Sequence, residues 1–394
     1  MKAKLRILAA RILSFLNMAV PKSAIAVVYG FPPDEGNAVE VLRALAQRYR
    51  GRTYWFDGPS GPLPFDLPDS IRAVSRLTPR GVLLYLRAEL IFYTHGLYGP
   101  VVPARRQTIV NLWHGDGIKV KNVDALGARS IAPASFVVGG TRLLTARKAL
   151  DFKMGERSTI VVGNPRIAQF SVEPSNEQLS RLGIDPHAPY VLWLPTFRAA
   201  KTVGATEGWV DSSQERSEEL SRLANELVDV LRRWGVQLVV KPHPLDRESF
   251  GGTRAIRVSS ADIRAAGISL YNLLGRSDGL VTDYSSVWTD YLTLDRAIGF
   301  LVPDKDQYRE GRGLYPDDVL EWLPGIEIDS SETMEQFAQD VRQKGQITTA
   351  LREAAVLRLG LVSDPSPADR LLEELLKRNA IAPYRFRSRL CATN

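Results

Sequence analysis

Five short motifs place side chains that can bind phosphate or move a proton directly after predicted β-strands. Ligands of open parallel sheets bind beyond the carboxyl ends of the strands, so residues at these positions are candidates for chemistry. The motifs are Asn111–Lys119, Val162–Arg166, Leu194–Arg198, Val240–Pro244 and Ser277–Asp290.

Two of the motifs contain a histidine. His114 stands between a tryptophan and a glycine, so its imidazole can reach a ligand that approaches the glycine backbone. His243 stands between two prolines, which suits a rigidly placed group. Either histidine can instead be an ordinary core or capping residue. His95 and His187 have no such neighbours, and we interpret both as structural.

The strongest phosphate-binding pattern lies in the last motif. A predicted strand ends at Thr282, and the sequence from Asp283 to Ser286 opens a helix. Serine hydroxyls and N–H groups at a helix N-terminus can bind phosphate, although the same serines can form an ordinary N-cap. Arg198 follows another strand and can grip a phosphate bidentately, while Arg166 follows a tight turn that is also explained as structural.

Several common site patterns are missing from the sequence. It has no Walker-type phosphate loop, no Gly-x-Ser-x-Gly elbow and no Gly-x-Gly-x-x-Gly after the first predicted strand. The Asp304-Lys-Asp306 segment has metal-binding spacing, but it lies in a predicted turn and we expect no metal site there. No Cys/His cluster has zinc spacing. With one cysteine, Cys391, the chain has no intrachain disulfide, which fits a reducing, cytosolic compartment.

The composition is that of a folded protein with room for two domains. The chain has 394 residues, of which 44% are hydrophobic and 24% charged, so it is neither disordered nor collagen-like. The net charge of +7 is concentrated at the ends: residues 1–22 and 376–394 each carry +5 and no acid, and the rest carries −3. A nucleic-acid binder usually has a basic stripe through its folded part, so we expect no nucleic-acid partner.

The N-terminal segment, residues 1–23, predicts an amphipathic helix that lies on a membrane surface. Its apolar residues recur at helical spacing and its basic residues lie mostly elsewhere; the apolar set is Leu5, Leu8, Ile12, Phe15, Leu16 and Ala19. The segment is too short and too charged to span a bilayer. A signal peptide, or a helix packed on the protein's own core, remains an alternative explanation.

Past residue 24 the pattern alternates strands with helices, which favours βαβ units and parallel sheets. The predicted strands are 24–29, 52–56, 71–75, 90–94, 107–112, 135–139, 159–162, 190–194, 236–241, 278–282 and 297–302. The predicted helices are 39–48, 81–88, 141–152, 216–234, 262–275 and 286–294, and the segment 330–378 is mostly helical. We therefore expect an α/β fold with two Rossmann-like lobes, at 24–170 and 190–378, a linker at 171–189 and a basic tail at 379–394.

Together the motifs resemble the CDP-glycerol glycerophosphotransferase family of teichoic-acid and capsule enzymes. The resemblance covers about residues 107–320 and is carried by Trp113-His-Gly, Gly163-Asn-Pro-Arg166, Pro195-Thr-Phe-Arg198, Lys241-Pro-His-Pro244, Thr282-Asp-Tyr-Ser-Ser-Val287 with Asp290, and Tyr308-Arg…Arg312-Gly313. It implies a glycosyltransferase-B-like fold attached peripherally to the cytoplasmic membrane face. It also implies transfer of glycerol phosphate from CDP-glycerol to a hydroxyl of a lipid-linked saccharide or polymer, with no cofactor.

The resemblance also implies roles for individual residues. His114 would be the catalytic base, and His243 its partner at the pyrophosphate. Phosphate ligands would be Ser285, Ser286 and Arg198. The remaining residues assigned to donor binding are Gly115, Asp116, Arg166, Thr196, Lys241, Asp283, Asp290 and Arg312.

The chain departs from the family pattern after the first histidine. The family usually continues with threonine and a proline, whereas this chain has Asp116-Gly117, which bears on the acceptor or on the pKa of His114. Two alternatives stay open: the same fold with CDP-ribitol or a nucleotide-sugar as donor, and a non-catalytic membrane-associated binder of nucleotide-linked metabolites. The length somewhat favours a primase over a polymerase.

Overall fold

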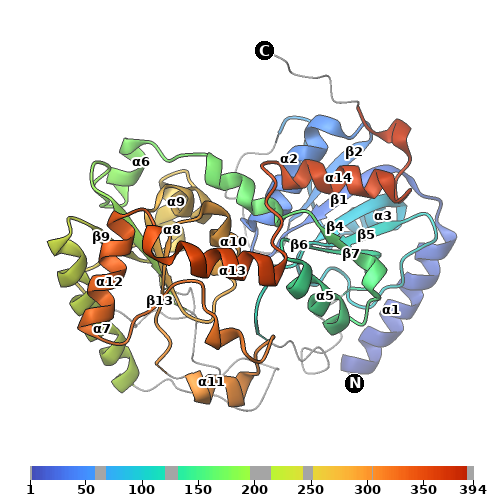
Figure 1. Ribbon diagram of the computed structural model, residues 1–394. Helices are drawn as coiled ribbons and strands as arrows, with labels where there is room; N and C mark the ends of the chain where they lie inside the picture. The colour runs from blue at the N-terminus through green and yellow to red at the C-terminus, as the bar shows by residue number, and fades with distance from the viewer. Residues whose placement is uncertain are drawn as a thin grey trace. The chain divides into compact units, whose positions relative to one another are not determined.

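A computed structural model describes residues 2–57, 68–119, 132–195, 214–242, 252–303 and 305–387 (Figure 1). The chain divides into two units. The first contains Met1–Gly115, Asn122–Ala168 and Val362–Asn394, and the second contains Asp116–Lys121 and Gln169–Leu361. Each unit is built on its own parallel sheet, which confirms the predicted α/β class with two Rossmann-like lobes.

In the first unit, seven described strands form a parallel sheet in the order β3-β2-β1-β4-β5-β6-β7. Their bounds are β1 Ser23–Tyr29, β2 Arg52–Asp57, β3 Ile71–Ser75, β4 Ala88–Tyr93, β5 Thr108–Asn111, β6 Phe136–Gly139 and β7 Thr159–Val161. The middle strands β1, β4 and β5 are mostly apolar and almost entirely buried, as a sheet covered on both sides requires. Every one of them was predicted, with bounds that differ by two residues at most.

Helices cover the two faces of this sheet. Alternate residues of β1 point to opposite sides, so Ala26 and Val28 join a core with α2 (Gly36–Arg48) and α14 (Pro367–Lys377). Ile25 and Val27 join a second core with α3 (Pro79–Arg87) and α1 (Lys2–Ala19). The helix α5 (Arg142–Asp151) packs on β6 and β7.

The second sheet has six described strands in the order β10-β9-β8-β11-β12-β13, also all parallel. Their bounds are β8 Tyr190–Leu194, β9 Gln237–Val240, β10 Ile256–Arg257, β11 Gly279–Thr282, β12 Ala297–Phe300 and β13 Ile326–Glu327. The two-residue edge strands β10 and β13 were not predicted, because two residues carry no period that a sequence pattern can reveal.

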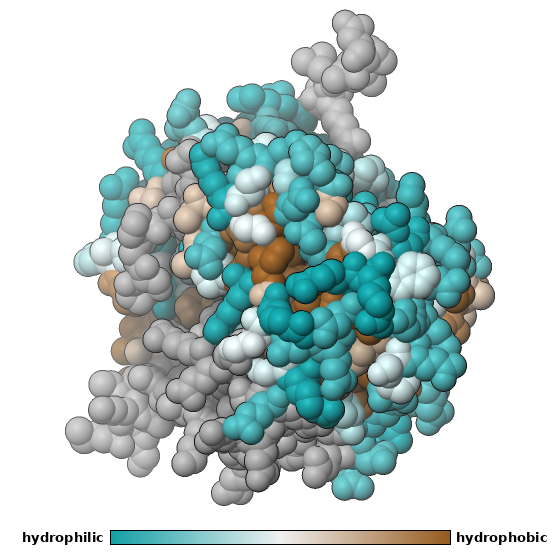
Figure 2. Space-filling model, turned by 90° about the vertical axis from the view of Figure 1, so that its left-hand side faces the viewer, coloured by the Kyte–Doolittle hydropathy of each residue, from teal (hydrophilic) through white to brown (hydrophobic). Residues whose placement is uncertain are grey.

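Helices α7 (Gln214–Arg233) and α12 (Ser331–Arg342) pack on one face of the second sheet around Val191, Trp193 and Phe337. Figure 2 looks onto the side of the molecule that carries these two helices, and most of its described surface is hydrophilic. The remaining helices of the unit are α6 Asn176–Arg181, α8 Ser260–Ala265, α9 Leu270–Arg276, α10 Val287–Tyr291, α11 Lys305–Arg312 and α13 Thr349–Leu359. Helix α6 lies within the segment predicted as a linker.

One predicted helix, 262–275, is two helices in the structure. Helix α8 ends at Ala265, and Gly267 adopts a positive φ of 72° that an α-helix cannot contain. Ser269 then starts α9 by accepting a hydrogen bond from the Asn272 N–H, in a reciprocal capping box. The Gly-Ile-Ser sequence therefore ends α8 and begins α9, although the apolar periodicity continues through both helices.

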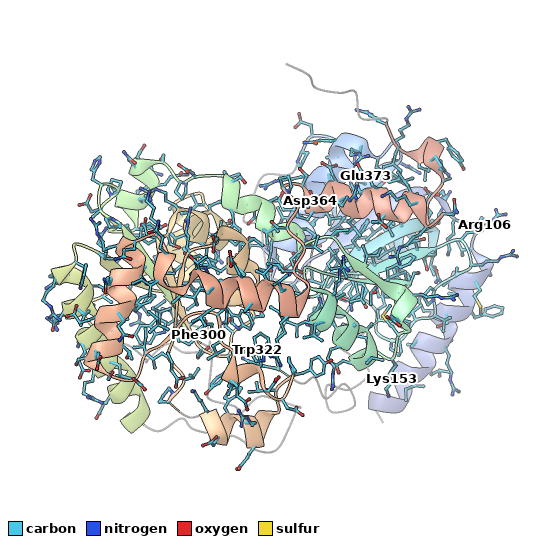
Figure 3. All side chains as sticks on the ribbon, viewed as in Figure 1. Arg106, Lys153, Phe300, Trp322, Asp364 and Glu373 are labelled. Atoms are coloured by element: carbon cyan, nitrogen blue, oxygen red, sulfur yellow. The ribbon has the colours of Figure 1, made fainter. Side chains whose placement is uncertain are left out.

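The C-terminal part of the chain returns to the first unit. We predicted a second lobe through residue 378, but the first unit resumes at Val362. The physical reason is α14, whose Leu371, Leu372 and Leu375 are completely buried in the core that α2 also lines. Arg48 on α2 adds ion pairs to Asp369 at 3.1 Å and to Glu373 at 3.5 Å, and Glu373 is labelled on α14 in Figure 3.

Helix α1 buries Ala10, Ser14 and Asn17 and leaves most of its large apolar residues exposed. The Asn17 amide donates to the Val102 carbonyl at 2.9 Å and to Gln107 Oε1 at 2.7 Å. The outward residues Ile7, Leu8, Ile12, Phe15, Leu16 and Met18 are 40–68% exposed. The predicted helix is therefore present; Leu13 packs against the core of the first unit, whereas the six outward residues stay exposed.

Candidate active site

In both sheets the chain order reverses next to the first strand of the unit. In the first sheet, β1 lies between β2 and β4; in the second, β8 lies between β9 and β11. The connections that leave neighbouring strands at this point go to opposite faces, which opens a crevice at their carboxyl ends where ligands bind. The residues that follow β1, β4, β8 and β11 therefore lie where ligands of such sheets bind.

His114 is presented by a tight loop that follows β5, the neighbour of β4. The Trp113 N–H donates to Asn111 Oδ1 at 3.0 Å, which turns the chain sharply where the strand ends. Trp113 has a φ of 49° and Gly115 a φ of 98°. A positive φ is costly for a tryptophan, so the surrounding structure must hold this loop in place.

The imidazole of His114 belongs to a cluster of rings. Its centroid lies 4.9 Å from Trp113 and 5.6 Å from His95, and the Trp113 ring meets Phe152 edge-on at 4.9 Å. His95 follows β4 and is half-buried, and burial lowers its pKa below the usual value. His95 is therefore neutral near pH 7 and adds no positive charge beside His114.

Arg166 lies close to the same loop, at Gly115. Its side chain is buried, and its guanidinium Nη1 lies 3.6 Å from Glu35 Oε1. A Cβ atom added at Gly115 would fall 2.2 Å from Arg166 Nη2, and the residue's φ of 98° also disfavours a side chain, so the position favours glycine. The structure thus brings Gly115 and Arg166 together, in an arrangement that holds the loop.

In the second unit, Asp283, Ser285 and Ser286 follow β11 as predicted. Asp283 is buried and the two serines are half-buried. The helix α10 that starts after them has only five residues. Ser286, at its N-cap position, makes no side-chain capping bond, and the Val287 N–H reaches Ser285 Oγ only at 3.4 Å. The serines thus form no strong cap, which weakens the ordinary N-cap explanation.

Two motifs distant in sequence meet at the start of α10. The Thr289 hydroxyl donates to the Asp116 carbonyl at 3.1 Å. A Cβ at Gly117 would lie 3.6 Å from the Cβ of Ser286. The Asp116-Gly117 pair, which departs from the family pattern, therefore lies against the predicted phosphate-binding serines.

Asp290 is placed in the interior of the second unit. It is 2% exposed, and its Oδ2 accepts a hydrogen bond from the Tyr271 hydroxyl at 2.6 Å. Tyr271 in turn stacks on Phe170, with 5.0 Å between the ring centroids. This environment fits a residue that supports α10 better than one that touches a ligand directly.

The other predicted residues are described only in part. Lys241 follows β9 and is half-buried, and its N–H donates to the Trp193 carbonyl at 3.0 Å. Arg312 ends α11, the helix whose Tyr308 ring stacks on Tyr284 at 3.6 Å. Thr196, Arg198, His243 and Asp304 lie outside the described residues, as does the side chain of Arg312.

Sequence reasoning missed three residues at the first switch point. Glu35 and Asn37 follow β1, and His95 follows β4, at the strand ends where ligands of such sheets bind. Their position after the first strand could have marked Glu35 and Asn37 as site residues. The Gly-Phe-Pro-Pro turn there, however, matches no phosphate-loop pattern. His95 was interpreted as structural because its flanking residues carry no site pattern. Its ring lies 5.6 Å from that of His114, which is nineteen positions away in sequence.

Two parallel sheets with polar residues at both switch points define the chain as a glycosyltransferase-B-like α/β protein. The model of the family CDP-Glycerol:Poly(glycerophosphate) glycerophosphotransferase matches residues 34–377. The chain belongs to this family, which is the resemblance that the motifs indicated.

Curated relatives act in teichoic acid synthesis. The chain is 26% identical over 328 residues to the teichoic acid poly(glycerol phosphate) polymerase of Bacillus subtilis, covering 76% of this chain and 41% of that protein. It is 25% identical over 237 residues to the teichoic acid ribitol-phosphate primase of Bacillus spizizenii, covering 55% and 57%. It is 25% identical over 276 residues to the teichoic acid glycerol-phosphate primase of Bacillus subtilis, covering 64% and 65%. The matched part thus spans from two fifths to just under two thirds of these relatives.

Solved structures share the fold. The wall teichoic acid polymerase TagF superimposes with a TM-score of 0.68 at 19% identity, over 91% of this chain and 89% of that one. The UDP-GlcNAc 2-epimerase of Methanocaldococcus jannaschii gives 0.53 at 11% identity, over 91% and 100%. At these identities the likeness shows the fold alone.

Among the described residues, no helix is long and apolar enough to cross a membrane.

Proposed function

We propose that the protein transfers glycerol phosphate from CDP-glycerol to a hydroxyl of a membrane lipid-linked saccharide or polymer and releases CMP. The acceptor oxygen attacks the phosphorus that carries glycerol, and the bond from this phosphorus to the oxygen bridging it to CMP breaks. The hydroxyl proton leaves to a base, and the electron pair of the broken bond leaves with CMP. Such a transfer depends mainly on alignment and charge stabilisation.

His114 is the proposed base. It is half-buried in a loop whose backbone is held by neighbouring side chains, and neutral His95 beside it adds no positive charge that would disfavour its protonation. An imidazole is a suitable general base for the acceptor hydroxyl.

The second unit supplies the proposed donor contacts. Ser285 and Ser286 would donate hydrogen bonds to the diphosphate, with Lys241, Arg198 and His243 offsetting its negative charge. These residues follow β8, β9 and β11, which are adjacent in the sheet, and this adjacency supports the proposal. Burial of Asp290 and Arg166 favours positioning roles for both in place of direct donor contact.

The single observation that carries the proposal is the family match over residues 34–377, which includes every one of these positions. The test is release of CMP from CDP-glycerol, measured with and without a lipid-linked saccharide acceptor. We expect acceptor-dependent release with a glycerol phosphate unit added to the acceptor, and the product length separates one addition from many. Binding without release would favour the non-catalytic alternative.

A second donor, CDP-ribitol, deserves a parallel test. The observation in its favour is the similarity to a ribitol-phosphate primase, at an identity equal to that with a glycerol-phosphate primase. Comparing kcat/KM for CDP-glycerol, CDP-ribitol and a nucleotide-sugar with one acceptor decides among the donors.

We also propose that α1 binds an anionic membrane surface on the cytoplasmic face. Its outward residues Ile12, Phe15 and Met18 are 54–68% exposed, and a hollow of about 340 Å³ beside them is lined by Val102 and Arg11 among others. Clustered exposed apolar residues of this kind mark interaction surfaces. The basic residues of positions 1–22 add attraction to anionic lipid, about 1 kcal/mol each at best.

Point variants test this proposal better than deletion, because deleting α1 would also remove the buried Asn17. Flotation with phosphatidylglycerol vesicles should show binding that falls with salt and is reduced by Ile12→Ser with Phe15→Ser. The matched control is Leu357→Ser, since Leu357 is 82% exposed on α13. Equal loss in the control, or unchanged binding in the α1 variant, would contradict the membrane role.

A further inference from the structure

One buried side-chain amide, that of Asn37, connects the two motifs of the first unit that contain His114 and Arg166. Asn37 lies in the first turn of α2, directly after the turn that leaves β1, and it is completely buried. Its Nδ2 donates to the Trp113 carbonyl at 3.2 Å, and its Oδ1 accepts from the Arg166 N–H at 3.1 Å. A single side chain therefore holds the loop that carries His114 and the turn that carries Arg166.

The chemistry of these two bonds requires an amide. The Trp113 carbonyl needs a donor and the Arg166 N–H needs an acceptor, so the orientation of the Asn37 amide follows from its partners. Asparagine supplies both groups at this length, whereas an ionised aspartate can only accept and alanine can do neither. Because the site is buried, a group left unsatisfied there costs more than at the surface.

The loop that Asn37 holds is one that would not keep its shape by itself. Trp113 has a φ of 49°, a strained conformation for a non-glycine residue that persists only when neighbours impose it. The bond from Asn37 is made at the carbonyl of this strained residue, one peptide before His114. Losing it lets Trp113 relax and moves the imidazole that follows.

The same turn of α2 also steadies the other side of the loop. Glu35 caps α2 by accepting from the Ala38 N–H at 3.1 Å, and its second oxygen lies 3.6 Å from the Arg166 guanidinium. That guanidinium passes against the backbone of Gly115. The residues before and after His114 are thus both held from the amino-terminal turn of one helix.

We propose that Asn37 is a positioning residue for His114, fixing the strained Trp113–Gly115 loop through its paired bonds to Trp113 and Arg166. The inference rests on the proposed role of His114 as the base. It predicts that the geometry of the proton transfer, and with it kcat, depends on the Asn37 amide, while donor affinity does not.

The test compares Asn37→Asp and Asn37→Ala with a matched control on the strand that leads into the loop. Thr108, at the other end of β5, donates from its hydroxyl to the Ala380 carbonyl at 2.6 Å. Thr108→Val therefore removes one partly buried bond to a backbone carbonyl, as Asn37→Asp does, but at the end of the strand away from His114.

We expect both Asn37 variants to lower kcat by about 10- to 100-fold, since a displacement near 1 Å costs about that much. KM for CDP-glycerol should stay within about threefold of the wild-type value. Thr108→Val should lower the melting temperature about as much as the Asn37 variants do, but should leave kcat unchanged. A second readout is the NMR titration of the His114 imidazole, assigned by its absence in His114→Gln; it should shift in the Asn37 variants and not in the control.

Some outcomes would overturn the inference and spare the proposed function. If Asn37→Asp folds with wild-type kcat and an unchanged His114 titration, while His114→Ala is inactive, Asn37 does not position the base. If neither Asn37 variant folds while Thr108→Val does, Asn37 is a general requirement of the core and selective positioning is wrong. By contrast, absence of transfer by the wild-type protein, or full activity of His114→Ala, would contradict the proposed function itself.

Discussion

The polar residues at the strand ends of the two sheets are used in different ways. In the first unit, Asn37 and Arg166 are buried, and Asn37 is bonded both to the loop that carries His114 and to the Arg166 N–H. In the second, Ser285 and Ser286 are half-buried, and Ser286 makes no side-chain capping bond. Motif residues at one sheet therefore hold a loop, while those at the other present hydroxyls that can donate to a ligand.

Burial distinguishes two family motifs that look alike in sequence. The Gly163–Arg166 and Thr282–Ser286 motifs both follow strands and both look like ligand sites in sequence. Burial separates them, because a side chain that is nearly inaccessible and already bonded has little capacity to contact a substrate. The following predictions test that separation, beginning with the largest expected effect.

Replacing the proposed base should have the largest effect. We expect His114→Ala to lower kcat by about 10²–10⁴ while CDP-glycerol affinity changes little, because the general base acts on the acceptor hydroxyl. Single-turnover CMP release and calorimetric donor binding measure the two quantities. The control is His187→Ala, since His187 is exposed in the segment before β8 and should be dispensable. Near wild-type turnover of His114→Ala would show that His114 is not the general base.

Replacing the two serines should change donor affinity. We expect Ser285→Ala with Ser286→Ala to weaken CDP-glycerol binding by at least tenfold, because a hydrogen bond to a charged group contributes about 1.5–3 kcal/mol. Ser259→Ala is the control, since Ser259 accepts the Asp262 N–H as the N-cap of α8. It should lower stability by about 0.5–2 kcal/mol and leave donor affinity unchanged. If the serine pair behaves like the control, the serines are structural.

The buried hydrogen bond between Tyr271 and Asp290 should stabilise the second unit without contributing to donor binding. We expect Tyr271→Phe to lower the free energy of unfolding by about 1–3 kcal/mol, because Asp290 loses a buried hydrogen-bond donor. Donor affinity should stay within about threefold. Tyr93→Phe, which removes the bond to the Ala132 carbonyl in the first unit, is the matched control. A loss of affinity as large as in the serine pair would make Asp290 a donor contact.

The smallest effect concerns pH and the attachment of α1. Burial lowers the pKa of Lys22 to about 8, and its ammonium donates to the Asn17 carbonyl at 2.7 Å and to Asn17 Oδ1 at 2.8 Å. Between pH 8 and the unfolded pKa of 10.5, the unfolded chain holds a proton that the folded chain has lost. Stability from this group therefore rises with pH across that window and is constant below it.

The measurement is the difference in melting temperature between wild type and Lys22→Met from pH 7 to 11. We expect this difference to move in favour of the wild type as the pH rises above 8. A flat difference would mean that Lys22 keeps its ordinary pKa and that α1 is held by Asn17 and its other contacts alone.

Much of the fold could be predicted from the sequence because its signals are local. The strands of the first sheet are apolar runs bounded by turns, and their ends follow directly from the residues in them. The motifs after β5, β7, β9 and β11 follow those strands as predicted. The break between α8 and α9 was missed because one apolar period runs through both helices, and only the backbone at Gly267 divides them.

The α/β class, the strand-end positions of His114 and the serines, and the family all follow from local sequence patterns. Which of these residues are buried and bonded to others, and which stay partly accessible, depends on tertiary contacts. Asn37 lies 76 positions from Trp113 and 129 from Arg166 in sequence, and α14 returns to the first unit from beyond the second. Contacts of that kind arise when βα units stack side by side, and no local pattern of residues encodes them.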